Sequence, residues 1–322
     1  LHSDTHSFPT RRSSDLVVLG RDGSGSLLQS GGSLTVHDTL HLGGATGGKG
    51  MYVVQGGMLT AATLRIGHEG EGVFYIGDAS AEVTVTERLR IGDTGTVMAA
   101  AGSTIRLDSA EWVNESETPG NLSNLRGMTV TPEGGAAARS FEVAGEDVGP
   151  VGEGLEDNFA LGVLNVGGGS SGWLRLDDFN DNRPGADGDE ALYVEELVLG
   201  PDSVLDLNGL NLYALRIDDR GGFLLENGGT LGRIYILGDF DASGVVNGLD
   251  IPGFKEALAD PAGWQAATGR DPVALGDFDG NGALNGLDIP LFKDSLAATA
   301  VPEPGIMAMV AVGVWAVGRV RR

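Results

Sequence analysis

A repeat with a period of about 24 residues constrains the fold of this chain more than any other feature of its sequence. Three segments align, and they span residues 40–61 (LHLGGATGGKGMYVVQGGMLTA), 64–85 (LRIGHEGEGVFYIGDASAEVTV) and 89–107 (LRIGDTGTVMAAAGSTIRL). Their first apolar runs superpose at Leu42, Ile66 and Ile91. Their second runs superpose at Leu34, Leu59 and Val83, and a fragment of an earlier copy begins at Val17.

Each copy consists of two or three short alternating runs separated by Gly, and none is long enough for a helix. Such a unit cannot bury its own apolar face, whereas stacked copies share one continuous core. Gly accounts for 54 of the 322 residues and aromatic residues for only 6%, which favours tight turns between short strands. The sequence therefore predicts a mainly β chain whose body is a β-solenoid, a parallel β-helix that advances about 4.8 Å per coil.

The period is clear over residues 16–111 and weaker beyond them. Residues 112–140 lose the register and are interpreted as a loop or insertion. Over residues 141–236 the pattern returns less cleanly, with Leu192-Tyr193-Val194 and Leu212-Tyr213-Ala214 about one coil apart. This region is expected to be either further β-solenoid or a β-sandwich.

A different repeat follows, in which GDFDASGVVNGLDIPGFKEAL from Gly238 recurs 38 residues later as GDFDGNGALNGLDIPLFKDSL. Oxygen donors fall at positions 1, 3, 5, 7, 9 and 12 of a twelve-residue loop, the spacing that wraps a chain around calcium. In the first loop these positions are Asp239, Asp241, Ser243, Val245, Asn247 and Asp250. In the second they are Asp277, Asp279, Asn281, Ala283, Asn285 and Asp288. Position 6, where the loop turns sharply, is glycine in both copies, Gly244 and Gly282.

Each loop leads into residues with helical spacing, Ile251, Phe254 and Leu258 after the first and Ile289, Phe292 and Leu296 after the second. Proline stands in the opening turn of each segment, where a missing N–H costs least. We therefore expect two short helices that pack on each other.

Residues 237–300, with a short segment around Trp264 between the loops, resemble a type I dockerin, an EF-hand-like pair. The resemblance implies calcium as the bound ion, the twelve loop positions above as its ligands and a cohesin-like partner. Ser243 replaces the usual Asp or Asn of that family. Gly248-Leu249 and Gly286-Leu287 stand where cohesin-recognising dockerins carry hydroxyl residues. These departures weaken the expectation of cohesin binding more than that of calcium binding.

The last 22 residues, 301–322, have three parts: Val-Pro-Glu-Pro, the apolar run GIMAMVAVGVWAVG and a basic end. The apolar run spans 14 residues, or roughly 21 Å as a helix, against a hydrocarbon core of about 30 Å. This order resembles the PEP-CTERM sorting signal, although an ordinary tail anchor is an alternative. The resemblance implies a short transmembrane helix, export through the inner membrane of a Gram-negative-type bacterium and recognition of Pro302, Glu303 and Pro304 by an exosortase.

At the other end, LHSDTHSFPTRRSSDL has no apolar core of the kind that a signal peptide requires. It resembles a translated sequencing adapter, so residues 1–15 are interpreted as non-native and left out of the fold prediction. The true N-terminus and its signal peptide would then be missing from this sequence.

Composition makes some classes of partner and of active site unfavourable for this chain. The net charge of −24 disfavours nucleic acid as a partner, and the chain has no Cys for a disulfide or a thiolate site. The densest carboxylate cluster comprises Asp177, Asp178, Asp181, Arg183, Asp187, Asp189 and Glu190, among residues typical of an exposed loop. Trp173, Tyr193 and Tyr213 could stack on sugar rings if exposed, but isolated aromatic residues in strands are more often core.

We therefore expect an exported, non-catalytic cell-surface or extracellular-matrix protein that binds calcium. The alternatives are a polysaccharide lyase or hydrolase and an exopolysaccharide-binding protein, each on the same β-helix platform. A carboxylate pair facing a groove would favour the enzyme, and an exposed aromatic row without such a pair would favour the binding protein.

Overall fold

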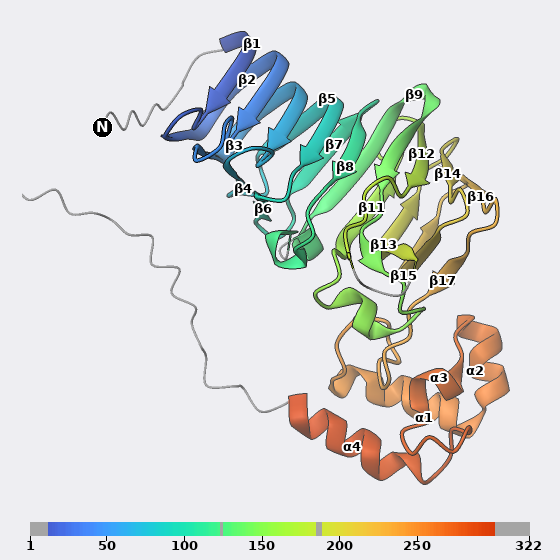
Figure 1. Cartoon of the computed structure of the whole chain (residues 1–322). Coiled ribbons are helices and arrows are strands. Elements are labelled where there is room, and N and C mark those ends of the chain that lie inside the picture. Colours follow the sequence, from blue (N-terminus) through green and yellow to red (C-terminus); the bar gives the residue numbers. More distant parts are fainter. Residues whose placement is uncertain (1–11, 123–124, 185–188, 300–322) are drawn as a thin grey trace, which may run out of the picture. The chain divides into compact units, whose positions relative to one another are not determined.

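The computed structural model describes residues 12–122, 125–184 and 189–299. The chain forms two compact units, residues 1–236 and 237–322, which are considered separately below. The division falls where the loop pair was expected to begin. Strands make up most of the described residues of the first unit, and short helices make up most of those of the second (Figure 1).

Within its described residues, the first unit contains seventeen strands in one sheet. The strands are β1 (Arg12–Leu19), β2 (Ser24–Leu42), β3 (Lys49–Ile66), β4 (Glu71–Ile76), β5 (Glu82–Ile91), β6 (Gly95–Ala99), β7 (Thr104–Asp108), β8 (Glu111–Asn114), β9 (Thr129–Glu142), β10 (Gly145–Glu146), β11 (Leu161–Val166), β12 (Gly172–Asp177), β13 (Glu190–Leu199), β14 (Val204–Asp206), β15 (Asn211–Asp219), β16 (Phe223–Leu225) and β17 (Leu231–Arg233). Short 3₁₀ turns η1 (Pro119–Leu122), η2 (Leu125–Gly127) and η3 (Gly152–Leu155) interrupt them.

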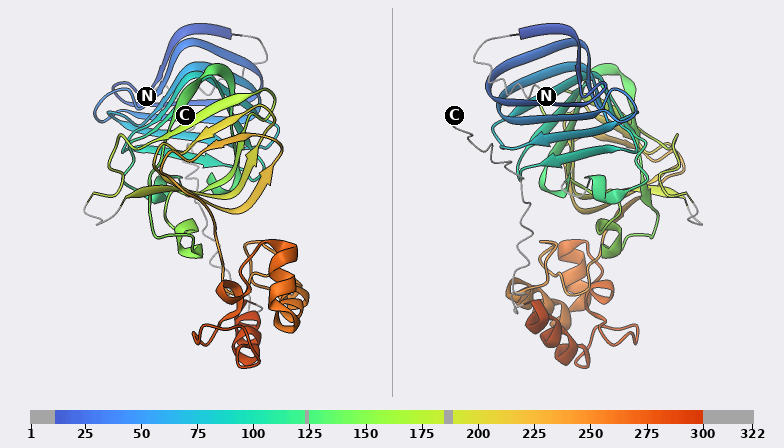
Figure 2. Two further views of the ribbon diagram at one scale, coloured as in Figure 1. Left: turned by 90° about the vertical axis from the view of Figure 1, so that its right-hand side faces the viewer. Right: turned by 60° about the vertical axis from the view of Figure 1, so that its left-hand side comes forward.

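Strands of successive coils pair in parallel, as a solenoid requires. The long strand β3 pairs with β2 on one side, and with β4 and β5 on the other. Later coils continue as β11, β13, β15 and β17, with β12, β14 and β16 on a second face. Among the described strands, only β10 and β13 pair antiparallel. Figure 2 shows the stacked coils, which confirm the β-solenoid and extend it into the region where a β-sandwich was the alternative.

The register agrees with the sequence alignment. Leu42 pairs with Ile66 and Ile66 with Ile91, while Leu34 pairs with Leu59 and Leu59 with Val83. Tyr193 pairs with Tyr213 on the later coils. Leu42, Ile66 and Ile91 are completely buried, because alternate residues of each strand point into the shared interior.

Glycine turns the corners of the coils at two equivalent positions. Gly43 and Gly67 follow Leu42 and Ile66, with φ of 75° and 64°. A Cβ at Gly67 would overlap the backbone of Gly95 on the next coil. The position therefore requires glycine both for its backbone conformation and for the close approach of the next coil.

The structure differs from the expected element bounds at two places. Strand β9 runs through much of residues 112–140, so the expected loop is confined to the segment between β8 and β9. This strand is hard to recognise because glycine and small residues interrupt its apolar pattern. Residues 12–15, left out of the prediction, begin strand β1, where Arg12 pairs with Leu34. Backbone groups at an open sheet edge can pair with a strand that has no apolar pattern.

The second unit contains the 3₁₀ turn η4 (Gly248–Asp250) and helices α1 (Ile251–Ala259), α2 (Pro261–Thr268), α3 (Pro272–Gly276) and α4 (Asp288–Thr299). Helices α1 and α4 begin at the ends of the two repeated loops, which confirms the helical spacing read from the sequence. Phe254 and Phe292 are buried and stack on each other, so these helices pack together as expected.

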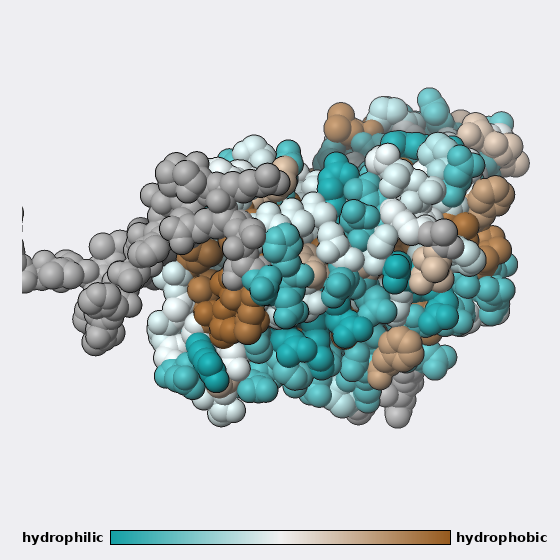
Figure 3. Space-filling view, turned by 90° about the horizontal axis from the view of Figure 1, so that it is seen from above, coloured by the Kyte–Doolittle hydropathy of each residue, from teal (hydrophilic) through white to brown (hydrophobic). Residues whose placement is uncertain are grey.

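The expected C-terminal hydrophobic helix and the Pro302-Glu303-Pro304 motif lie outside the described residues. No helix within those residues has both the length and the apolar character needed to cross a membrane. On the face seen in Figure 3, hydrophilic residues predominate and apolar residues form separate patches.

Candidate functional site

Three aspartates converge in each repeated loop of the second unit. Asp239, Asp241 and Asp250 each offer an oxygen within 4.8 Å of the others, and Asp277, Asp279 and Asp288 do the same. Asp239, Asp250 and Asp288 are completely buried. The structure thus brings together the carboxylates expected at positions 1, 3 and 12 of both loops.

Backbone amides hold these carboxylates in the same way in both loops. Asp239 accepts hydrogen bonds from Ser243 N and Gly244 N, both at 2.9 Å. Asp250 accepts from Asp241 N at 3.0 Å and from Asn247 N at 2.8 Å.

In the second loop, Asp277 accepts from Asn281 N at 3.0 Å and from Gly282 N at 2.7 Å. Asp288 accepts from Asp279 N at 3.2 Å and from Asn285 N at 2.8 Å. The repeated network shows that the two sequences form the same loop geometry.

The position-6 glycines turn as expected, with φ of 83° at Gly244 and 84° at Gly282. No atom lies within 4 Å of the place that a Cβ would occupy at Gly282. The preference for glycine there comes from the backbone conformation and not from crowding.

The remaining expected ligands lie on the same loops, where they bond to one another. Ser243 Oγ and Asn247 Nδ2 both donate to the carbonyl oxygen of Val245, at 3.1 Å. Asn285 Nδ2 donates to the carbonyl oxygen of Ala283 at 3.0 Å, and Asn281 Oδ1 accepts from Ala283 N. Positions 5 and 7 are exposed and position 9 is half-buried in both loops, so these residues lie nearer the surface than the buried aspartate at position 12.

The pKa values of two carboxyls in the first loop shift in opposite directions. Burial raises the pKa of Asp239 to about 6, although hydrogen bonds from Gly244 and Ser243 act in the opposite direction. Burial also opposes ionisation of Asp241, but hydrogen bonds from Ser243 outweigh it and lower the pKa of that carboxyl. Packing carboxylates this closely favours a cation among them, because like charges in one small volume repel.

Arg270, a residue that the sequence analysis did not single out, supports the first loop. It is buried, and its Nη2 donates to the carbonyl oxygen of Asp239 at 2.8 Å. Its charge acts to lower the pKa of Asp239. No motif marks it, because it lies between the loops in a segment without a repeat.

The acidic loop between β12 and β13 is divided between surface and interior. Asp178, Asp181 and Asp189 are exposed, whereas Asp177 and Glu190 are buried. Asp177 pairs with Arg175, its Oδ1 lying 3.0 Å from Nε. Arg183 pairs with Glu146 at 2.9 Å, and Asp187 lies outside the described residues.

The aromatic candidates for sugar stacking do not form one exposed row. Tyr193 and Tyr213 are buried, with ring centroids 5.2 Å apart, and the hydroxyl of Tyr193 bonds to Val148 N and Gly149 O. Trp173 is partly exposed, and its strand neighbour one coil away is Val204, followed by the exposed Phe223. Only Trp173 of the three could meet a ligand at the surface.

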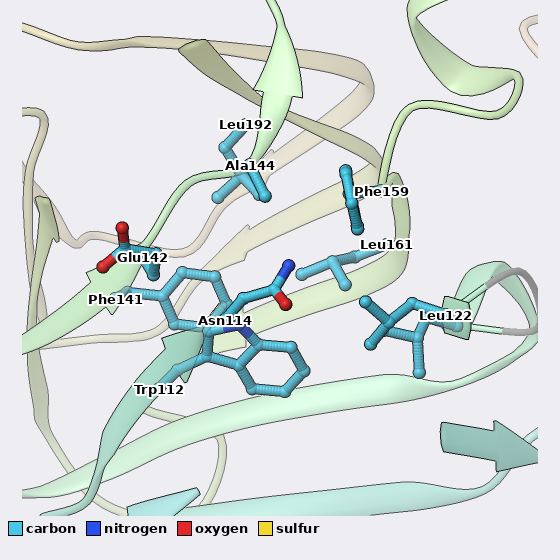
Figure 4. Close-up of a pocket in the computed structure, with 10 residues that line it drawn as sticks. Trp112, Asn114, Leu122, Phe141, Glu142, Ala144, Phe159, Leu161 and Leu192 are labelled. Carbon is cyan, nitrogen blue, oxygen red and sulfur yellow. The ribbon is translucent and has the colours of Figure 1, made fainter. Parts of the chain in front are cut away.

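A small pocket in the solenoid has Glu142 among the residues that line it (Figure 4). Trp112 and Phe141 stack in its wall with centroids 5.1 Å apart. Its volume of about 10 Å³ has room for roughly one water molecule and none for a sugar ring. Figure 4 shows the Glu142 carboxylate on the side of the pocket away from Leu122.

No curated protein and no solved structure matches the chain. The family model described as the PEP-CTERM protein-sorting motif matches residues 300–322. The chain therefore carries the signal of an exported protein whose membrane-anchored precursor is processed by an exosortase.

Proposed function

We propose that this protein is a non-catalytic component of the cell surface or extracellular matrix that binds calcium through its two repeated loops. The β-solenoid serves as an extended body, and the second unit serves as a dockerin-like, EF-hand-like module. The sorting motif accounts for export and exosortase processing, and the loops supply the calcium sites.

The convergence of three carboxylates in each loop carries this proposal. Calcium takes six to eight oxygen ligands, and carboxylate, amide and carbonyl oxygens suit it. Each loop offers three carboxylates within 4.8 Å, with buried aspartates at its last position. The carbonyls of Val245 and Ala283 complete the donor types that this ion prefers. Nothing in this donor set suits a soft metal, which would select thiolates or imidazoles.

Burial of the carboxylates in the body supports a non-catalytic role. Glu142 and Glu190 are two buried carboxyls of the body, with pKa values that burial raises to about 7. Their side chains are nearly inaccessible, and the pocket that Glu142 lines has room for about one water molecule. A glycosidic bond could not reach them in this conformation.

We infer the class of partner that the second unit binds from the side chains that it exposes. Leu249 and Leu287, at equivalent positions of the two loops, are 71% and 66% exposed. Exposed leucines suit an apolar protein surface better than a polysaccharide. A cohesin-like partner would therefore have to offer apolar residues at these positions, where cohesin-recognising dockerins carry hydroxyl residues. Binding of exopolysaccharide remains a second candidate function of the body, favoured by the exposed Trp173 and Phe223, which lie two coils apart with Val204 on the coil between them.

Isothermal titration calorimetry of the full chain in mild detergent, stripped with chelator, tests the proposal. Asp250→Asn and Asp288→Asn should each remove one bound calcium ion, and the double variant should lose both. Asp294→Asn, an exposed substitution on α4, serves as the matched control and should bind like the unmodified protein. A double variant that binds as many ions as the unmodified chain would overturn the proposal.

A further inference from the structure

Two buried glutamates of the solenoid body face the same short loop. Glu142 ends β9 and Glu190 begins β13, and their exposed fractions are 2% and 6%. Phe179 N and Asn180 N both donate to Glu142 Oε1 at 2.7 Å. Asn182 N donates to Glu190 Oε1, also at 2.7 Å. Residues 179–182 therefore connect the two carboxylates.

Each glutamate leaves its second oxygen without a donor. Glu142 Oε2, Glu190 Oε2 and Asn182 Oδ1 are buried and have no hydrogen-bond partner. Asn182 is completely buried, and its Nδ2 donates to the carbonyls of Asn114 and Ser116, at 3.0 and 2.9 Å. Because both partners are acceptors, the amide orientation is fixed and Oδ1 is the free atom. Unpaired buried acceptors are unfavourable, and ionised ones most of all.

The charges around these oxygens are negative. Asp178 and Asp181 lie close enough to Glu190 to raise its pKa further, as does Glu142 itself. Among the described residues, no Lys, Arg or His forms an ion pair with Glu142 or Glu190. Arg183, the nearest cation along the loop, is engaged with Glu146. The group lacks a positive partner from the described chain.

We propose that Glu142, Glu190 and Asn182 form a further calcium site, located in the solenoid body and separate from the two loops of the second unit. A hard divalent cation is the partner that such unpaired oxygens lack, because each is an acceptor of the type that calcium takes. The exposed Asp178, Asp181 and Asp189 would attract the ion and leave room for water in its remaining coordination positions. The bound ion would tie the ends of β9 and β13 to the loop between β12 and β13.

Equilibrium dialysis of the full chain against radioactive calcium tests this site. The unmodified protein should bind three ions, and the Asp250→Asn, Asp288→Asn variant should retain one. Adding Glu142→Gln and Glu190→Gln to that variant should remove the remaining ion. Glu226→Gln, an exposed change in the same unit, should leave the count unchanged.

Two results would overturn the inference. One is a folded Glu142→Gln, Glu190→Gln protein that binds as many ions as the unmodified chain. The other is an unmodified chain that binds two ions, both lost on substitution of Asp250 and Asp288. This second result needs no glutamate variant, so it decides the question even if the buried substitutions prevent folding. A chain that binds only these two ions would leave the proposed loop sites intact. If the Glu142→Gln, Glu190→Gln protein instead loses one ion and keeps the two loop ions, the further site is supported.

Discussion

The rings of Phe254 and Phe292 stack with their centroids 4.2 Å apart and their planes 22° from parallel. Each ring lies four residues after the last acidic position of its loop, Asp250 or Asp288. Phe240, next to Asp239, meets both rings edge-on at 5.4 and 6.1 Å. The aromatic cluster therefore connects the two candidate calcium loops through helices α1 and α4.

Replacing Phe292 with Ala should weaken calcium binding at both loops, and not only at the second loop, which leads into its helix. Removal of a buried phenylalanine from a packed core costs about 3–5 kcal/mol. We expect lower thermal stability of the second unit and weaker calcium binding at the first loop, measured by calorimetry. Ile289→Ala, a change at a 44% exposed position of the same helix, is the control. Equal losses from the two substitutions would contradict the coupling.

Substitution of Gly67 with Ala should destabilise the solenoid more than substitution of Gly47. Both glycines have positive φ, 64° and 81°, but only at Gly67 would a Cβ meet the backbone of the next coil. We expect Gly47→Ala to cost about 1 kcal/mol and Gly67→Ala about 3 kcal/mol or more in the free energy of unfolding. Chemical denaturation followed by circular dichroism measures both. Similar costs would show that coil contact at the corner does not matter.

In calcium-free buffer, the stability of the solenoid should fall as pH rises from about 4.5 to about 7. Burial raises the folded-state pKa of Glu142 and Glu190 from 4.5 to about 7. Between these values the unfolded chain has released protons that the folded chain still holds, so the free energy of unfolding decreases with pH. The loss is on the order of 3 kcal/mol for each carboxyl.

The Glu142→Gln, Glu190→Gln variant provides the control for this pH dependence, because its amides do not titrate. Its unfolding free energy should show little slope over the same interval. Denaturant titrations at several pH values, with chelator present, measure both proteins. An unmodified protein that gains stability from pH 4.5 to 7 would contradict the prediction, since it would mean that the two carboxyls fold in their ionised form.

The sequence was sufficient for features whose residues repeat at a constant spacing. The alignment of Leu42, Ile66 and Ile91 gave the observed register, because each coil buries the same position. The six loop aspartates were likewise found from their spacing. Glu142 could not be found in this way: it lies far along the chain from the acidic loop, and only the stacking of β9 beside β12 brings it there.

The pairing of Arg12 in β1 and the course of β9 were missed for a related reason. Backbone hydrogen bonds to a neighbouring coil hold these strands, and their side chains show no clear alternation. Arg270 was missed because a buried arginine that donates to one carbonyl leaves no pattern in a sequence. Local periodicity therefore predicts the coils and the loops, whereas contacts between distant segments need the folded structure.

Far-ultraviolet circular dichroism of the full chain, with calcium and with excess chelator, tests the central claim most directly. Calcium should offset most of the negative charge of the six clustered aspartates and order the loops that begin α1 and α4, because ligand binding and folding are coupled at such sites. We expect the helical signal to increase on calcium addition and to return to its starting value on chelation, and we expect no such increase in the Asp250→Asn, Asp288→Asn variant. Identical spectra with calcium and with chelator would contradict it.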